Sequence, residues 1–371
     1  MNFSDYDYVP TIRTRNAELL GVKNLRQETK NKILPQFRLS KVNRTTSAIG
    51  ALDKLLEAYN GPAILQLEDN KALRIEDNEY NELVNPDENF SAWMDFLNQA
   101  KGKNEELCAG LIYNSNTSKR DFIGQVKRME SEFGKMVFNF DPFDKRSVAA
   151  ASTAASVINE LSNILFIADS GQITRERQMA SLNATISAMN ELRSIDASID
   201  IVSSGTSFPN NFPPYLVSPN STCGVIPMLE WDNYHSFGGR QFAIYGDYAS
   251  IHGDFYKGSF AQFVARVDYP TPGEWIFERR RPKDPKNCDR PELYIAAANE
   301  IITNESWDNE LDVWGSQIIK QIAEGRTDGF CAPAKWISVR LNLHIERVLD
   351  FLEQGIVSQN GYNDFDEDID W

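Results

Sequence analysis

Residues 135–168 decide the fold, because they contain KMVFNF at 135–140, SVAAASTAASVINEL at 147–161 and NILFIA at 163–168. The first and last runs are short and apolar, which is typical of strands that are buried on both faces. The alanine-rich segment between them has the length and composition of a helix. This strand–helix–strand unit predicts neighbouring parallel strands in an α/β sheet.

The same unit recurs along most of the chain. Predicted strands occupy residues 8–13, 32–39, 63–68, 107–113, 135–140, 163–168, 199–203 and 242–245. Predicted helices occupy residues 17–25, 47–59, 89–100, 119–133, 147–161, 174–192 and 228–236. Eight strands that alternate with helices indicate a (β/α)8 TIM-type barrel. An open doubly wound sheet is the alternative, but the count of eight and the absence of a glycine-rich phosphate loop disfavour it.

A different pattern separates the eighth strand from the last helix. Two β-runs at 261–268 and 274–279 flank the turn residues 270–273, and helical patterns follow at 291–302 and 311–323. An amphipathic stretch at 334–352 is the predicted closing helix, with Ile337, Leu341, Ile345, Val348 and Leu352 on its inner side. We therefore expect a barrel over residues 1–355, with a hairpin and helical insertion at 256–333 over its C-terminal mouth. Residues 356–371 are predicted to form a flexible acidic tail.

The net charge of the chain disfavours some classes of binding partner. The 371 residues include 38 Lys and Arg against 53 Asp and Glu, for a formal net charge of -15. This balance argues against direct nucleic-acid binding and against an anionic membrane surface. The start, Met1 to Tyr8, is polar and acidic and lacks the pattern of a signal peptide, so we expect a cytoplasmic protein. The four scattered cysteines are then expected to be reduced thiols.

Polar residues at the predicted strand ends form a candidate pocket, since these ends meet at one mouth of a barrel. They are Arg13, Arg38, Glu68, Asp69, Asn114, Asp141, Asp169, Ser204 and Asp247. Glu68, Asp141, Asp169, Asp247 and, from the closing helix, His344 are the candidate catalytic residues. Arg13, Arg38 and Arg279 are the candidate ligands for a phosphate or another anion. Such a set suits acid–base or metal-assisted chemistry on a phosphoester or sugar. The alternative is that the acids cap the following helices and that His344 is structural.

Known cofactor and metal motifs do not settle the chemistry. The sequence has no HExxH motif, Cys/His cluster, EF-hand loop, GxSxG elbow or Walker loop, so no cofactor is identified and a divalent metal stays open. The one basic cluster runs from Arg279 to Lys283. It suits a phosphate, a nucleic-acid end or an acidic partner. A solvated hairpin end explains it equally well.

Several short motifs resemble the Beta protein family, whose satellite-phage representative is encoded beside the Gop and Cll proteins. They are Tyr8-Val9-Pro10 with Arg13 and Arg15, Ile33-Leu34-Pro35, Gly246-Asp247-Tyr248, Trp275 to Arg279, and Trp336-Ile337 through Asn342-Leu343-His344. The resemblance spans most of the chain. It implies a phage- or prophage-encoded protein linked to anti-phage defence or to the neutralisation of a partner toxin. It implies no particular reaction.

The last residues, DFDEDIDW at 364–371, combine acids with three large apolar side chains. They resemble the C-terminal tip of bacterial single-stranded-DNA-binding proteins, with Asp370 in place of the usual proline and Trp371 in place of phenylalanine. The resemblance implies docking onto host DNA-repair proteins that recognise this tip. Phe365, Asp366, Asp368, Ile369 and Trp371 are the candidate partner-binding residues. An acidic solubilising tail is the alternative.

Two classes of function follow from the sequence. The first is a defence or toxin-antagonist protein, in which the barrel is a scaffold and the tail contacts host repair proteins. The second is a hydrolase that acts on a phosphoester or nucleotide at the C-terminal mouth of the barrel. A fold alone does not choose between them.

Overall fold

The computed structural model describes residues 1–254, 263–284 and 288–356. A closed barrel of parallel strands forms its centre, in the order β1-β2-β3-β4-β5-β6-β7-β9. The barrel closes where β9 pairs with β1, with Pro10 opposite Asp247. The predicted (β/α)8 barrel is thus confirmed. Its strands are β1 (Tyr8–Arg13), β2 (Gln36–Leu39), β3 (Ala63–Leu67), β4 (Leu107–Gly110), β5 (Met136–Phe140), β6 (Ile164–Gln172), β7 (Ile201–Thr206) and β9 (Ile244–Asp247).

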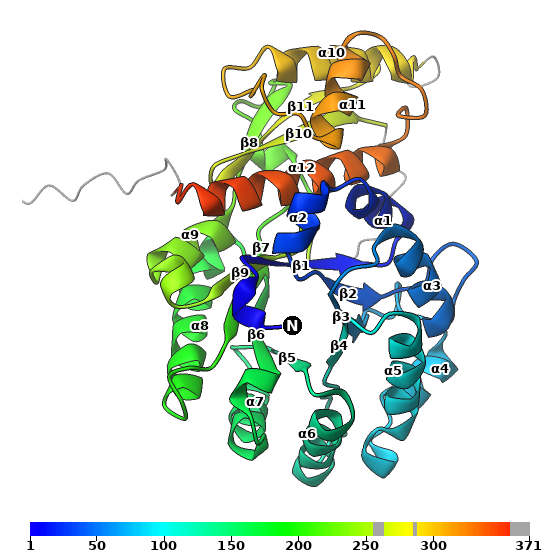
Figure 1. The fold of residues 1–371 in the computed structure, drawn as a ribbon. Coiled ribbons are helices and arrows are strands. Elements are labelled where there is room, and N and C mark those ends of the chain that lie inside the picture. Colours follow the sequence, from blue (N-terminus) through cyan, green and yellow to red (C-terminus); the bar gives the residue numbers. More distant parts are fainter. Residues whose placement is uncertain (255–262, 285–287, 357–371) are drawn as a thin grey trace, which may run out of the picture.

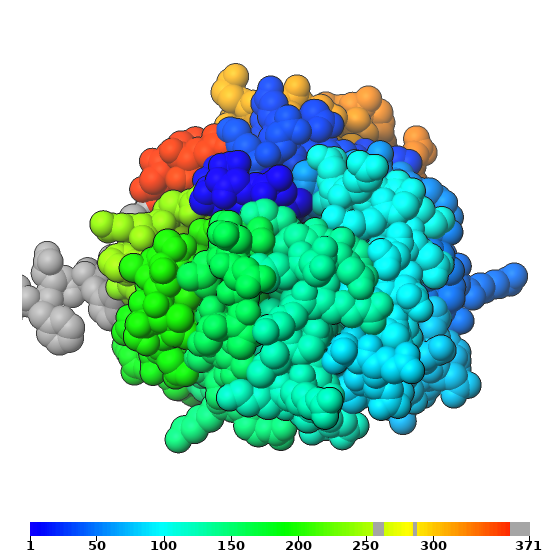
Figure 2. Space-filling model, turned by 60° about the horizontal axis from the view of Figure 1, so that its bottom comes forward, coloured from blue at the N-terminus to red at the C-terminus, as the bar shows by residue number. Residues whose placement is uncertain are grey.

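Helices surround the barrel, and Figure 2 shows those of the cyan-to-green part of the chain as a continuous outer surface. Side-chain caps mark the first turn of several helices. The Ser118 hydroxyl accepts a hydrogen bond from the Asp121 amide at the start of α6, and the Asp144 side chain accepts one from the Arg146 amide at the start of α7. The helices around the barrel are α1 (Asn16–Lys23), α2 (Gln27–Lys32), α3 (Ala48–Ala58), α4 (Asp77–Leu83), α5 (Ser91–Lys103), α6 (Lys119–Phe133), α7 (Lys145–Val157), α8 (Gln178–Arg193), α9 (Leu229–Ser236) and α12 (Pro333–Glu353).

Side chains alternate between the two faces of the barrel wall. One apolar cluster contains Val9 of β1, Ile64 of β3 and Ile244 of β9, which fill the barrel interior. Tyr8 and Tyr245, one position away, belong instead to the large cluster that includes the surrounding helices. The parity of each strand residue therefore decides whether its side chain points into the barrel or towards a helix.

An accessory layer packs against the outer side of α12 (Figure 1). It contains the antiparallel strands β8 (Cys223–Pro227), β10 (Ala265–Thr271) and β11 (Glu274–Arg280), in the order β10-β11-β8, and the helices α10 (Arg290–Ile302) and α11 (Trp314–Ala323). Trp336, Val339 and Leu343 of α12 join its apolar core. The hairpin of β10 and β11 and the two helices lie between β9 and α12 in the sequence, as predicted. Strand β8, which precedes β9 in the sequence, also belongs to this layer. This strand was not predicted from the sequence.

Candidate functional site

The ends of four barrel strands bring together two ion pairs at the C-terminal mouth. Arg13 Nε lies 2.6 Å from Glu68 Oε2, and Arg38 Nη2 lies 2.6 Å from Asp169 Oδ2. All four residues were predicted from their positions after β-runs. The Arg13–Glu68 pair is almost fully buried, whereas the Arg38–Asp169 pair keeps 17% and 12% of its side-chain surface exposed. The second pair is therefore the one that an incoming ligand can reach.

Tyr248 contacts both members of the Arg38–Asp169 pair. It was not among the site residues predicted from the sequence. Its hydroxyl donates to Asp169 at 2.8 Å and accepts from Arg38 Nη2 at 3.2 Å. The Arg38 guanidinium also lies over the Tyr248 ring, 4.9 Å from its centroid. The sequence does carry a signal for Tyr248 as a mouth residue, because Tyr248 directly follows Asp247 at the end of the last barrel strand.

The surrounding charges favour the ionised forms of Glu68 and Arg38. Burial alone raises the pKa of Glu68, but the nearby Arg13 and Arg38 outweigh it and hold this pKa below its usual range. Burial alone lowers the pKa of Arg38, but Tyr248 and Asp169 raise it above its usual value. Glu68 and Arg38 are therefore fixed charges rather than groups poised to exchange protons near neutral pH.

A cavity of about 190 Å³ opens beside the Arg38–Asp169 pair. Asp69 and Asp141 line it together with Gln66, Asn139 and Tyr113. Both acids are exposed; Asp69 accepts from the Tyr80 hydroxyl at 2.6 Å, and Asp141 accepts from the Phe143 amide at 2.8 Å. One basic side chain, Arg38, and several acidic or amide side chains thus surround a space whose lining suits a small polar ligand.

Other predicted mouth residues lie elsewhere. Asn114 stabilises its own turn, since its side-chain oxygen accepts from the Asn116 amide at 2.9 Å. Ser204 lines a small internal cavity beside Glu230. Arg279 lies on β11 of the accessory layer, away from the cavity at the mouth. The tail candidates Phe365, Asp366, Asp368, Ile369 and Trp371 lie outside the described residues.

Asp247 and His344 form a separate buried cluster between the barrel wall and α12. His344 Nε2 lies 2.6 Å from Asp247 Oδ2, and both side chains are almost completely buried. The hydroxyls of Tyr8 and Tyr245 also donate to the Asp247 carboxylate. Since Asp247 has the parity of Tyr245, it points towards the helices and not into the barrel mouth. This arrangement suits a structural connection.

Within residues 1–254, 263–284 and 288–356, no three His, Cys, Asp or Glu side chains gather as metal ligands do. In the same ranges, no helix has the length and hydropathy of a membrane span.

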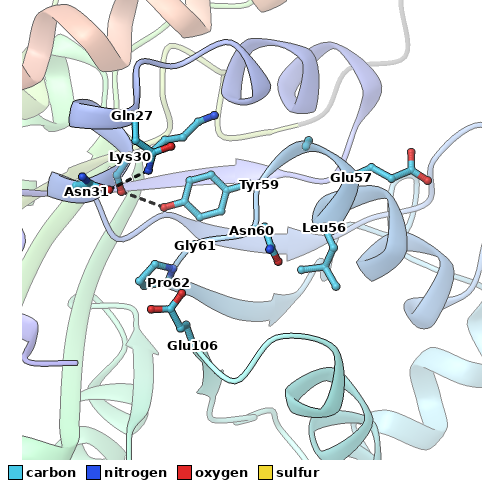
Figure 3. Close-up of a pocket in the computed structure, with 11 residues that line it drawn as sticks. Gln27, Lys30, Asn31, Leu56, Glu57, Tyr59, Asn60, Gly61, Pro62 and Glu106 are labelled. Atoms are coloured by element: carbon cyan, nitrogen blue, oxygen red, sulfur yellow. Dashed lines mark hydrogen bonds between the residues drawn. The ribbon is translucent and has the colours of Figure 1, made fainter.

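The opposite end of the barrel carries a larger hollow of about 620 Å³ (Figure 3). Lys30, Pro62 and Glu106 line it, and they precede β2, β3 and β4. Among its lining residues, the Tyr59 hydroxyl donates to the Lys30 carbonyl at 3.3 Å and the Gln27 side-chain amide donates to Asn31 Oδ1 at 2.9 Å. Residues at this end of such barrels serve stability, so the candidate site is at the C-terminal mouth.

Fold and site together define a (β/α)8 barrel protein with an accessory α/β layer and a charged mouth. The family model described as Beta protein matches residues 8–350, and the chain therefore belongs to the Beta protein family. It is 30% identical over 373 residues to Protein beta of Enterobacteria phage P4, covering 99% of each chain. These matches make it a phage-related protein.

A solved structure shows a more distant likeness. It is a GH5-4 broad specificity endoglucanase from an uncultured bacterium, with 12% sequence identity and a TM-score of 0.37. The similarity covers 62% of this chain and 76% of the endoglucanase. At this distance it says nothing about activity.

Proposed function

We propose that this protein is a phage- or prophage-encoded anti-phage defence or toxin-antagonist protein that acts through protein–protein contacts. In this proposal its acidic C-terminal segment docks onto host DNA-repair proteins. One observation carries the docking: residues 364–371 follow the order of the single-stranded-DNA-binding-protein tip, from Asp364-Phe365 to Ile369 and the terminal Trp371. The pairing of Glu68 and Asp169 with arginines at the mouth supports a scaffold over an acid–base centre.

The tail chemistry explains how such docking works. The Trp371 ring enters an apolar pocket of the partner. The acids at 366–368 and at 370 meet a basic rim, which speeds association and makes binding sensitive to salt. The partner of the tail is therefore a protein with a tip-binding pocket.

A pull-down with a purified repair protein that binds the tip tests this proposal. Truncation after Gly361 and Trp371→Ala should each abolish capture, because both remove the aromatic anchor. Trp371→Phe is the matched control, since it restores the residue usual in such tips and should preserve capture. Failure of the full-length chain to bind, or equal binding by Trp371→Ala, contradicts the proposal. Co-purification from the native host then identifies any toxin partner.

A second candidate, a hydrolase of a phosphoester or nucleotide, is favoured by one observation at the mouth. Asp69, Asp141 and Asp169 line the same cavity as Arg38, which is the placement of catalytic groups in barrel enzymes. Asp141→Asn and Asp169→Asn should then abolish defence or toxin neutralisation without unfolding the protein. Asp95→Asn, an exposed change on α5, is the matched control. Full activity of both mouth variants contradicts the hydrolase.

A further inference from the structure

A groove of about 460 Å³ lies where the accessory layer meets the barrel. Phe208 lines it from the segment after β7 and His252 from the segment after β9. Arg266 of β10, Arg279 of β11 and Arg340 of α12 complete its charged side. None of the residues that line the cavity at the barrel mouth lines this groove, so the two sites are distinct.

The lining is strongly basic although the whole chain is acidic. It contains Arg266, Arg279, Arg281 and Arg340, and its single acid is Asp268. Arg266 Nε lies 2.9 Å from Asp268 Oδ1, and Arg340 Nη1 lies 3.1 Å from Asp268 Oδ2. One carboxylate is thus shared by two guanidinium groups, which leaves an excess of positive charge in the groove.

Arg279 supplies much of this excess. Its neighbour Arg280 pairs with Glu278 at 2.7 Å and with Glu300 at 3.1 Å. The Arg279 side chain, by contrast, has no ion pair or hydrogen bond within the described residues, although it is half-buried. Burial, followed by the charge of Arg281, lowers the pKa of Arg279, as expected of a cation without a nearby anion.

A buried hydrogen-bond donor without a partner in the described residues lies in the wall of the groove. Tyr294 of α10 lines the groove and is 1% exposed, yet its hydroxyl has no hydrogen-bond partner within the described part of the chain. Buried hydroxyls nearly always have a partner, and this one, which solvent does not reach, would gain a partner in the groove only if the neighbouring wall shifts. The Tyr294 ring stacks on Trp336 at 4.8 Å, which holds this hydroxyl in place.

Apolar surface lies next to the cations. Phe212, Val264 and Ile337 line the groove and are each partly exposed. The guanidinium carbons of Arg266 and Arg340 lie over aromatic rings, 3.3 Å from the Phe212 centroid and 4.1 Å from the Phe208 centroid. These contacts limit the motion of both guanidinium groups. The groove therefore combines fixed positive charge with an apolar wall.

We propose that this groove binds a small anionic ligand of the nucleotide class. Phosphate oxygens pair with the guanidinium groups of Arg279 and Arg281, and the base lies against the apolar wall of Val264 and Ile337. Arginine recognises phosphate through two parallel hydrogen bonds, and the cavity volume lies in the range of small-molecule sites. The limited volume favours a mononucleotide over an extended acidic peptide.

Titration calorimetry on the full-length protein tests the site, with ATP, GTP, adenosine, inorganic phosphate and a synthetic peptide of residues 361–371 as separate probes. We expect a nucleotide to bind, adenosine to bind at least about tenfold more weakly, and Arg279→Gln to weaken nucleotide binding by a similar factor. Arg120→Gln, on the exposed start of α6, is the matched control and should leave binding unchanged.

Three results overturn the proposal: no nucleotide binding, equal binding by Arg279→Gln, or binding of the peptide in place of the nucleotides. Arg279→Gln is expected to fold normally because the arginine is only half-buried, and thermal unfolding checks this. If that variant unfolds, Arg281→Gln, at an exposed position, takes its place in the same titration. The assay contains no partner protein, so its outcome is independent of the docking of the tail.

Discussion

His344 Nε2 lies 2.6 Å from Asp247 Oδ2, and this contact fastens the last helix to the strand that closes the barrel. Tyr8 and Tyr245 donate to the same carboxylate from the two adjoining strands. Burial raises the pKa of Asp247, but His344 and the hydrogen bonds outweigh it and hold this pKa below its usual value. The carboxylate is therefore an ionised structural centre shared by β1, β9 and α12.

Asp247→Ala should consequently lower the free energy of unfolding by about 3–5 kcal/mol, because it leaves buried donors without their acceptor. Urea unfolding followed by circular dichroism measures this loss. Asp69→Ala, an exposed aspartate on the same barrel, should change stability by less than about 1 kcal/mol. Equal stability of the two variants contradicts the structural role. A loss of biological activity in Asp247→Ala alone does not identify a catalytic residue.

Glu230 makes the stability of the fold dependent on pH. It is buried on α9, and burial together with the charge of Asp247 raises its pKa from 4.5 to about 8. The folded chain therefore keeps this carboxyl protonated at pH values where the unfolded chain releases the proton. Its contribution to stability is complete below pH 4.5 and is lost as the pH rises towards about 8.

Glu230→Gln should remove that part of the pH dependence, since the amide cannot ionise. Melting temperatures measured at intervals from pH 4.5 to about 8 should fall less steeply for this variant than for the parent protein. Glu105→Gln, at an exposed position, should keep the parent profile. Parallel profiles for parent and Glu230→Gln would show that the carboxyl is already ionised in the fold.

The barrel could be predicted because the strands of a buried parallel sheet appear in the sequence as short runs of apolar residues. The helix at 119–133 has its predicted bounds, since a serine cap and the apolar face of Phe122, Val126 and Met129 mark it. The polar helices α2 (QETKNK) and α4 (DNEYNEL) carry no such periodicity and were missed. Strand β8 was missed because only pairing with β11, about 50 residues later, makes it a strand.

The site was predictable to a lesser degree. Positions after apolar runs correctly brought Arg13, Arg38, Glu68 and Asp169 to one mouth. The same rule does not say which face of a strand a side chain occupies, and Asp247 lies on the helix-facing side with Tyr245. In a strand that is buried on both faces no polarity contrast marks the inside. His344 likewise lies on a helix that is covered on two sides, by the barrel and by the accessory layer.

The barrel interior is tightly packed at Gly110, and substitution there should be costly. A Cβ at this position would lie 1.9 Å from Gln66 Oε1 and 2.6 Å from the Leu65 carbonyl oxygen. Gly110→Ala should therefore destabilise the protein by about 1–3 kcal/mol, as overpacking does. Gly102→Ala is the matched comparison on α5, where a Cβ meets nothing within 4 Å. That change should stabilise the protein by about 0.5–1 kcal/mol, and urea unfolding of both variants should show opposite signs.

The accessible ion pair at the mouth should be strongly coupled, which bears on what the mouth can bind. Arg38 has Asp169 at 2.6 Å and Tyr248 at 3.2 Å, with most of the arginine side chain buried. A double-mutant cycle with Arg38→Gln and Asp169→Asn should give a coupling free energy of about 1–3 kcal/mol. The exposed pair Lys54–Glu57 is the control, for which about 0.3–0.5 kcal/mol is expected.

Unfolding measurements on the parent, the two single variants and the double variant provide each cycle. Strong coupling means that an anion entering the mouth competes with Asp169 for Arg38, so the mouth binds anions weakly unless Asp169 is neutralised. Asp169→Asn should then increase phosphate affinity at the mouth while the groove around Arg279 is unaffected. A coupling energy near that of the Lys54–Glu57 pair would instead show that Arg38 is available to a ligand without this change.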